Sequence, residues 1–166
     1  GMETNMTQPL PMMKIASPVG VLTLVADGDS LVAILWENDD PARVPLPPTV
    51  TAAAHPVLVE AGRQLGEYFV GRRRAFDLPL RFRGTEFQRA VWAKLLAIPF
   101  GETSSYGAIA RALGRPGAAR AVGAANGRNP ISIVAPCHRV IGANGAITGF
   151  AGGLAAKETL LALERR

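Results

Sequence analysis

The feature that most constrains the fold is a change of pattern near residue 81. Before it, short β-rich runs alternate with turn sequences, and after it apolar residues recur every three or four positions. Strand-type residues in one half and helix-type residues in the other are typical of an α+β fold. We therefore predict a disordered N-terminus over residues 1–12, an N-terminal α/β domain over residues 13–80 and a C-terminal domain over residues 81–166.

The first half predicts a small sheet and one helix. Three β-rich runs separated by turns favour a meander; they span residues 14–17, 21–26 and 31–37. Residues 38–51 are rich in proline and predict an irregular connection. Apolar spacing over residues 56–70 predicts a helix with Pro56 in its first turn. Residues 76–82 favour one more strand, which Pro79 would place at a sheet edge.

The second half predicts mainly helices. A capping-box pattern at Thr85 begins the first of them. Two short helices joined by a tight Gly-Arg-Pro turn then indicate a helix-turn-helix. A strand is expected over residues 131–135, followed by a hairpin turn at Asn144 and Gly145. Together these elements predict a winged helix-turn-helix. The expected helices span residues 86–97, 106–113, 117–126 and 154–164.

The helix expected over residues 117–126 carries almost only small side chains. Reading bases in the major groove needs long polar side chains, whereas small residues let a backbone approach a minor groove closely. Tight packing between helices would explain the same pattern. The net charge of +5 favours a polyanionic partner, although an ordinary basic protein can carry the same charge.

Cys137 is the only cysteine. It excludes an intramolecular disulfide and a cysteine-rich zinc site, and a single thiol fits a reducing compartment. No apolar run reaches the ~18 residues of a membrane span, and residues 2–13 do not have the pattern of a signal peptide. We therefore expect a cytoplasmic protein with no membrane partner.

The pair Cys137 and His138 is the densest chemical signal. A thiolate nucleophile needs a base or a positive field in order to form at neutral pH. Adjacent side chains of an extended segment point to opposite faces, so direct contact would need a turn, which Pro136 favours, and otherwise a water would bridge the two. The ordinary alternative is an inert buried cysteine beside a structural histidine.

Glu164 is the second signal, because it lies beside the apolar stripe of the last expected helix. A buried carboxylate needs a partner, and His138 is one candidate, which would give a Cys–water–His–Glu relay. Exposure near the chain's end is the alternative. Other candidates also have ordinary readings: Asn129 as a turn residue, Tyr106 as packing and Arg120 as a surface charge.

Residues 129–140, which run from Asn129-Pro130 through Pro136-Cys137-His138-Arg139, resemble the active-site signature of the O6-alkylguanine-DNA alkyltransferases, also called methylated-DNA–protein-cysteine methyltransferases. Residues 81–88, 101–106 and 152–154 are similar to further family segments, in the family order. The resemblance is close over residues 84–164 and extends only in outline to the first half. It implies an RNase H-like N-terminal lobe and a C-terminal winged helix-turn-helix lobe whose recognition helix enters the minor groove of double-stranded DNA.

The resemblance also implies the function. The protein would flip O6-alkylguanine, and also O4-alkylthymine, out of duplex DNA and transfer the alkyl group irreversibly to Cys137, without a cofactor and as a monomer. His138 would act through water and Glu164 would orient it, while Asn129 would tie the helix-turn-helix to the active-site loop. Tyr106, Val140, Phe150, Ala151 and Gly152 would contact the extruded base. Arg120 would take the place of the flipped nucleotide, and Ala121, Gly123, Ala124 and Asn126 would line the DNA-binding helix.

Two departures from the family stand out. Phe150 and Ala151 occupy positions where some members carry Tyr and Ser, which we expect to change the preference among alkyl groups. Some members bind zinc through Cys and His of the N-terminal lobe, but here that lobe has only His55, so we expect no metal. A lesion-sensing DNA-binding protein without transfer is the main alternative, and relatives of that kind lack the cysteine. A transcription regulator would need longer side chains on the recognition helix, and a cysteine hydrolase or redox enzyme would need turnover or a second cysteine.

Overall fold

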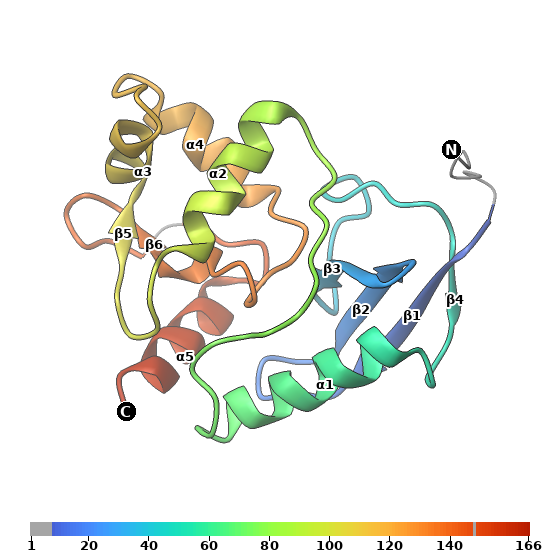
Figure 1. Cartoon of the computed structure of the whole chain (residues 1–166). Coiled ribbons are helices and arrows are strands. Elements are labelled where there is room, and N and C mark those ends of the chain that lie inside the picture. Colours follow the sequence, from blue (N-terminus) through green and yellow to red (C-terminus); the bar gives the residue numbers. More distant parts are fainter. Residues whose placement is uncertain (1–7, 148) are drawn as a thin grey trace. The chain divides into compact units, whose positions relative to one another are not determined.

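The computed structural model describes residues 8–147 and 149–166 (Figure 1). The chain divides into two compact units, with the boundary between Arg81 and Phe82. Strands dominate the first unit and helices the second, so the predicted α+β class is confirmed. No helix among the described residues is long and apolar enough to cross a membrane.

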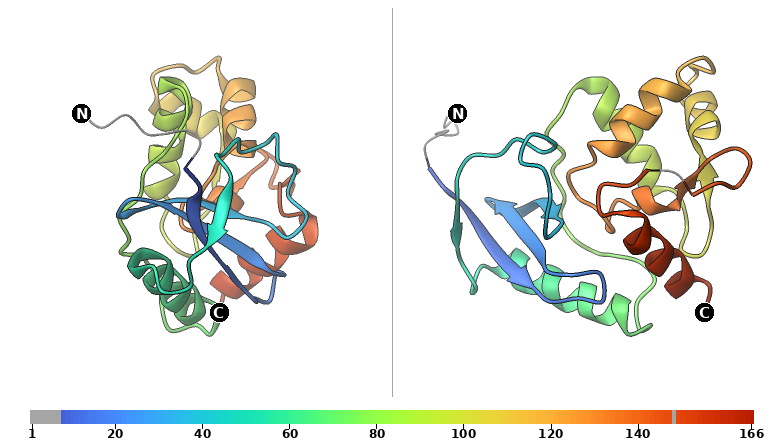
Figure 2. Two further views of the ribbon diagram at one scale, coloured as in Figure 1. Left: turned by 90° about the vertical axis from the view of Figure 1, so that its right-hand side faces the viewer. Right: turned by 180° about the vertical axis from the view of Figure 1, so that it is seen from behind.

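The described part of the first unit, from residue 8 onward, forms a four-stranded sheet with one helix against it (Figure 2). The spatial order is β3-β2-β1-β4, with antiparallel pairs except for β4, which is parallel to β1. Gly62 of the helix lies against Met13 and Leu24 of the sheet. The elements are β1 (Leu10–Ile15), β2 (Leu22–Asp27), β3 (Ser30–Leu35), β4 (Thr49–Thr51) and α1 (Pro56–Phe69).

Two predictions for the sheet were wrong. β1 begins at Leu10, inside the segment expected to be disordered, while residues 1–7 of that segment lie outside the described residues. Pro11 fits this strand because the ladder between β1 and β2 starts only at Met12. The Leu10 amide and the Met12 carbonyl meanwhile bond toward β4. β4 lies in the stretch that was expected to be irregular. Local sequence does not reveal this strand, because it forms only by pairing with β1, which is far away in sequence.

The strand expected over residues 76–82 is reduced to a single bridge between Leu80 and Leu31 at the β3 edge. The backbone of Asp77 instead pairs with the buried side chain of Gln64. Its amide donates to Gln64 Oε1 and its carbonyl accepts from Gln64 Nε2, both at 2.9 Å. A side-chain amide of α1 thus takes the place of a neighbouring strand.

Among its described residues, the second unit contains four α-helices and a two-stranded parallel sheet. The capping box at Thr85 is present as predicted, and Ser105 caps the next helix by accepting from the Ala108 amide. The elements are α2 (Glu86–Leu96), β5 (Ser104–Ser105), α3 (Tyr106–Ala112), α4 (Ala119–Gly127), the 3-10 turn η1 (Cys137–Arg139), β6 (Val140–Ile141) and α5 (Leu154–Glu164).

Two local predictions for this unit need correction. Residues 131–135 do not form a strand but a compact turn that includes a bridge between Ser132 and Ala135. The turn at Asn144 and Gly145 exists, with Gly145 at φ +81°, but among the described residues no strand pair flanks it. β6 pairs instead with β5. Because α3 begins directly after β5 and Cys137 lies just before β6, this pairing brings the start of α3 close to the segment that contains Cys137.

Candidate active site

Cys137 lies in a tight turn rather than in an extended segment. Pro136, at φ −82° and ψ 67°, leads into η1, and the Val140 amide closes the turn on the Cys137 carbonyl. The cysteine is 4% exposed and belongs to the apolar cluster between α2, α3 and α4. The backbone therefore presents the thiol from a buried, fixed turn.

Asn129 shapes the loop that leads to this turn. Its fully buried side chain donates from Nδ2 to the Ala135 carbonyl at 2.8 Å and accepts from the Ile131 amide at 3.1 Å. Between these anchors Ile133 adopts φ +75°, a conformation that β-branched residues rarely take. Such strain persists only where the surroundings enforce it, and here the Asn129 bonds do so.

His138 and Glu164 meet although they are 26 residues apart. Nε2 of His138 lies 2.7 Å from Oε2 of Glu164, and both side chains are buried. Since an ionised carboxylate accepts, Nε2 carries the proton and Nδ1 is left as the basic nitrogen. Nδ1 is buried and has no hydrogen-bond partner among the described residues. This is the arrangement of a neutral imidazole ready to accept a proton.

Burial lowers the pKa of His138 below its ordinary value, and the hydrogen bond that His138 donates to Glu164 opposes this only in part. The folded pKa therefore lies below the unfolded one. As the pH falls below about 6.5, the unfolded chain binds a proton that the folded chain resists, so stability is lost.

We expect the free energy of unfolding to fall as the pH is lowered toward 5.5. In His138→Gln this fall should be less steep, and the two slopes should differ by up to about 1.4 kcal/mol per pH unit. His55→Gln is the matched control, because His55 is the only other histidine. Denaturant titrations across this range measure the difference. An unchanged pH slope in His138→Gln would contradict the burial argument.

Glu164 is held by more than His138. Arg139 donates from its Nε at 2.8 Å and from a terminal nitrogen at 3.0 Å to the two carboxylate oxygens. Its other terminal nitrogen donates to the Ile98 carbonyl at 2.6 Å, and its guanidinium lies over the Phe100 ring. Such a two-point ion pair keeps Glu164 ionised and fixes its plane.

Gly101 also contacts Glu164. Its amide donates to Oε1 of Glu164 at 3.3 Å, and its φ of +81° suits glycine. A Cβ there would lie 3.2 Å from the Glu164 backbone oxygen. The turn after α2 is thereby joined closely to the last residue of α5.

The residues expected to contact the base differ in their exposure. Tyr106 and Phe150 are half-buried and pack against the cluster that contains Cys137. Val140 is buried, Gly152 is half-buried, and Ala151 is exposed in the turn before α5. The structure thus places Tyr106, Val140 and Phe150 in or against the cluster that contains Cys137, while Ala151 and Gly152 follow Phe150 in the same unit.

The predicted DNA-binding helix, α4, divides into two faces. Arg120, Ala121 and Ala124 are exposed, and Gly123 is half-buried beside the Tyr106 ring. Asn126 corrects the prediction, because it is buried. It follows Val122 by four positions, so the helical period turns it into the core and away from the exposed face.

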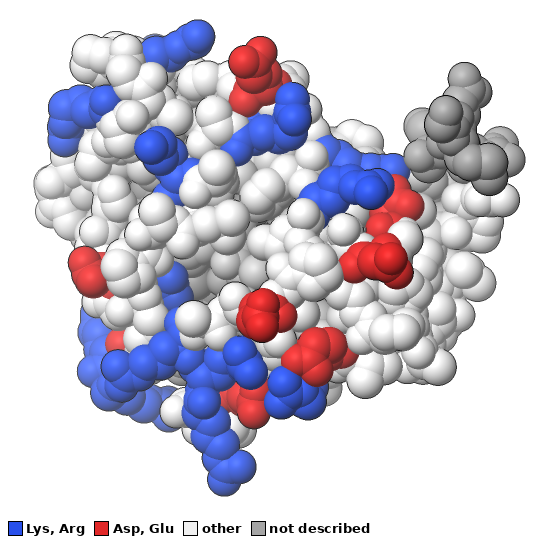
Figure 3. All heavy atoms as spheres, in the orientation of Figure 1, with Lys and Arg blue, Asp and Glu red and all other residues white. Residues whose placement is uncertain are grey.

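Basic side chains outnumber acidic ones on the segment from α2 to the end of α4. On the face drawn in Figure 3, most of the charged side chains over these helices are lysine or arginine. The basic residues of the segment are Arg89, Lys94, Arg111, Arg115 and Arg120, and the acidic ones are Glu86 and Glu102. A polyanion would be attracted to this unit.

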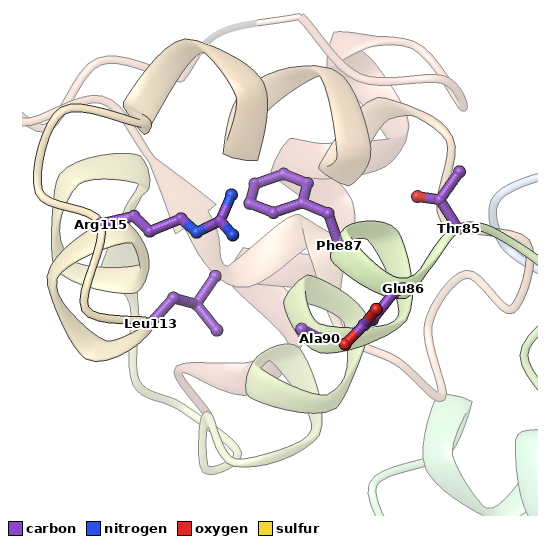
Figure 4. Close-up of a pocket in the computed structure, with 6 residues that line it drawn as sticks. All are labelled: Thr85, Glu86, Phe87, Ala90, Leu113 and Arg115. Atoms are coloured by element: carbon purple, nitrogen blue, oxygen red, sulfur yellow. The ribbon is translucent and has the colours of Figure 1, made fainter.

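A surface pocket of about 480 Å³ lies between the start of α2 and the turn that follows α3. In Figure 4 the Arg115 side chain reaches toward the Phe87 ring, 5.7 Å from guanidinium carbon to ring centroid. Thr85, Glu86, Ala90 and Leu113 line the rest. His138, Arg139 and Glu164 do not line this pocket, although Phe87 and Leu113 also pack against the apolar cluster that contains Cys137.

Two residues of the site escaped the sequence analysis. Arg139 was noted as part of a motif but given no role, and Lys157 was not considered. Lys157 is fully buried, and its Nζ donates to the Val140 carbonyl at 2.7 Å. Its signal was available: Lys157 stands seven residues before Glu164, on the same helical face. Among the described residues, no group of three or more His, Cys, Asp or Glu side chains could hold a metal ion.

Comparisons with known proteins agree with this geometry. Residues 86–166 match the family model of the 6-O-methylguanine DNA methyltransferase DNA binding domain, and residues 12–82 match that of its ribonuclease-like domain. The methylated-DNA–protein-cysteine methyltransferase of Mycolicibacterium paratuberculosis is 52% identical over 92% of this chain and 90% of its own. That of Methanosarcina acetivorans is 47% identical over 89% and 94%.

The likeness extends to solved structures. The crystal structure of Mycobacterium tuberculosis OGT in complex with DNA aligns with a TM-score of 0.82 and 47% identity. The alignment covers 93% of this chain and 92% of that one. Both units of the fold therefore have counterparts in that protein.

Proposed function

Since the chain belongs to the 6-O-methylguanine DNA methyltransferase family, we propose that Cys137 is the residue that accepts the alkyl group. The protein repairs alkylated guanine in DNA by transferring that group to a cysteine, and Cys137 is the only cysteine in the chain. The observation that carries the proposal is the buried turn in which His138, oriented by Glu164, directly follows this thiol.

The proposed reaction is a displacement at the alkyl carbon. The thiol proton passes through a water molecule to Nδ1 of His138. The thiolate sulfur then bonds to the alkyl carbon while the bond from that carbon to guanine O6 breaks, and guanine leaves with the electron pair. Hydrogen bonds from the Tyr106 hydroxyl and the Ala151 amide stabilise the leaving base. The guanine anion takes up one proton from water, and His138 releases to water the proton that it accepted from the thiol. A thioether is stable, so each chain acts once.

Glu164 and Arg139 together keep His138 in the neutral form with its proton on Nε2. The ion pair with Arg139 leaves the Glu164 carboxylate ionised, and the carboxylate holds the proton of His138 on Nε2. Because the ring is buried, the imidazole stays neutral at pH 7 and can act as a base.

We propose that α4 enters the minor groove and that Arg120 fills the gap left by the flipped nucleotide. The exposed face of α4 offers Ala121 and Ala124, which allow close approach but cannot read base edges. The target carbon lies inside the duplex, so the base has to be extruded before the thiol can reach it. O4-alkylthymine would enter the same way.

Arg120→Ala is expected to slow transfer from duplex DNA by about tenfold or more, because nothing then supports the extruded state. Transfer from the free base O6-benzylguanine needs no flipping and should keep its rate. Arg111→Ala removes the same charge from an exposed position of α3 and serves as the control. Equal losses on duplex and free base would place Arg120 in the chemistry instead.

Three further proposals concern the setting. The chain acts as a monomer, because every group of the site comes from residues 98–164 of one chain. It works in the cytoplasm, where a lone thiol stays reduced. Ala151, in place of the family's serine, shifts preference among alkyl groups through a missing hydroxyl contact.

The stoichiometry of repair tests the proposal. Incubating a fixed amount of protein with increasing O6-methylguanine duplex should remove one lesion per chain and then stop. Removal that continues beyond one per chain would indicate turnover. Tight binding with no removal would support the alternative of a lesion sensor.

A further inference from the structure

Trp92 is a buried residue of α2 that the proposed mechanism does not use. Its side chain is 2% exposed, and its indole Nε1 donates to the Ala125 carbonyl of α4 at 2.8 Å. The two helices pack against each other within the second unit (Figure 1). A side-chain hydrogen bond therefore joins the predicted DNA-binding helix to the helix that supports it.

The Ala125 carbonyl lies in the last turn of α4, where backbone carbonyls have no partner of the regular helical kind. The Arg128 amide reaches this carbonyl at 3.1 Å, and the indole of Trp92 supplies a second, shorter hydrogen bond. Ala125 and Trp92 are both buried, so water cannot take the place of the indole. Without the indole N–H, the end of α4 would be held less firmly.

The position of the indole is itself fixed. The Phe82 ring packs against the Trp92 ring, with 5.5 Å between the two centroids. A Cβ at Gly84 would lie 2.6 Å from Cη2 of Trp92, so the backbone of Gly84 closes the space beside the ring. The donor therefore has little room to follow a displaced helix, and a shift at the end of α4 would break the hydrogen bond.

The same end of α4 leads through short hydrogen bonds to Cys137. The Asn126 carbonyl accepts from the Asn129 amide at 3.2 Å, and the Asn129 side chain donates to the Ala135 carbonyl at 2.8 Å. That carbonyl also accepts from the Cys137 amide at 2.8 Å. The helix end that Trp92 holds is therefore connected, through Asn129, to the turn that presents the thiol.

We propose that Trp92 is a positioning residue: it fixes the end of α4 so that DNA bound on the exposed face of this helix lies in register with the thiol of Cys137. Its indole nitrogen bonds to backbone inside the unit, so it acts through α4 and not on the substrate. The inference rests on the proposed contact of α4 with DNA and adds the group that holds the helix in place. Small misplacements of reacting groups slow a reaction strongly, so a looser α4 should slow attack on the extruded base.

Replacing Trp92 with phenylalanine tests this, because Trp92→Phe removes the indole donor and keeps an aromatic ring in the core. At saturating DNA, single-turnover transfer from O6-methylguanine duplex should slow by about tenfold. The half-saturating concentration should stay within about twofold, because the exposed face of α4 is unchanged. Transfer from free O6-benzylguanine, which needs no contact with α4, should keep its rate. Trp36→Phe makes the same change in the first unit and should alter none of these values.

A duplex rate in Trp92→Phe equal to that of the unmodified protein overturns the proposal. Equal slowing on the duplex and on the free base also overturns it, because Trp92 would then only support the core around the thiol. Should Trp92→Phe fail to fold, Gly84→Ala carries the same comparison, since its Cβ displaces the indole but leaves the N–H in place. If instead α4 does not contact DNA, Arg120→Ala will leave duplex transfer unchanged, whereas failure of the present inference leaves the effect of Arg120→Ala intact.

Discussion

Replacing Cys137 with serine is expected to abolish alkyl transfer to below the detection limit. A serine hydroxyl at this position keeps the size of the side chain but ionises far less readily than a thiol, so the displacement has no nucleophile. The chain offers no second cysteine to substitute. Single-turnover assays on duplex O6-methylguanine measure the loss.

The same variant should bind duplex DNA much as the unmodified protein does. Cys137 is buried behind α4, whose exposed face carries the proposed contacts. Circular dichroism and a gel-shift titration on the same preparations separate loss of chemistry from loss of fold. Residual transfer by Cys137→Ser would place the acceptor elsewhere, and loss of DNA binding would mean that the turn supports the DNA-binding face.

The second large effect is expected for Glu164→Gln. The change removes the charge that partners both Arg139 and His138, and leaves a guanidinium buried without its carboxylate. Breaking such a buried pair costs about 3–5 kcal/mol, which lowers the melting temperature by about 10 °C. We also expect transfer to slow by about 100-fold, because His138 loses the group that fixes its proton on Nε2.

Glu158→Gln is the matched control, since Glu158 lies on the same helix but is exposed. It should change neither stability nor rate measurably. Calorimetry and single-turnover kinetics at a temperature where both variants are folded give the two readouts. A Glu164→Gln variant as stable and as fast as the control would show that the contacts of Glu164 with Arg139 and His138 are needed neither for stability nor for transfer.

Local sequence patterns predicted much of the fold. The capping box at Thr85 fixed the start of α2, and the final helix appears with the bounds that its spacing indicates. β4 and the loop before Cys137 could not be predicted in this way. β4 depends on pairing with β1, and the apolar run 131–135 would suit a strand if Asn129 did not bind both of its ends.

The candidate site divides along similar lines. The signature around Cys137 and His138 is contiguous, so it could be recognised, and the apolar stripe drew attention to Glu164. Arg139 and Lys157 were passed over because long basic residues are usually exposed. Their burial depends on hydrogen bonds to carbonyls of distant segments, from Arg139 to Ile98 and from Lys157 to Val140, and only the folded structure reveals these bonds. Asn126 was expected on the DNA-binding face of α4 because it belongs to the same helix as the small residues. Membership of the helix does not determine which face a residue occupies, and Asn126 lies on the buried face.

The central claim is that the alkyl group ends on Cys137, and mass spectrometry tests it most directly. The protein is incubated with duplex DNA that carries O6-methylguanine, weighed intact and then digested. The account predicts a gain of one methyl group per chain, located on the peptide that contains Cys137, and no gain with undamaged DNA. An unmodified mass despite tight binding to the damaged duplex, or a methyl group on any other residue, would contradict it.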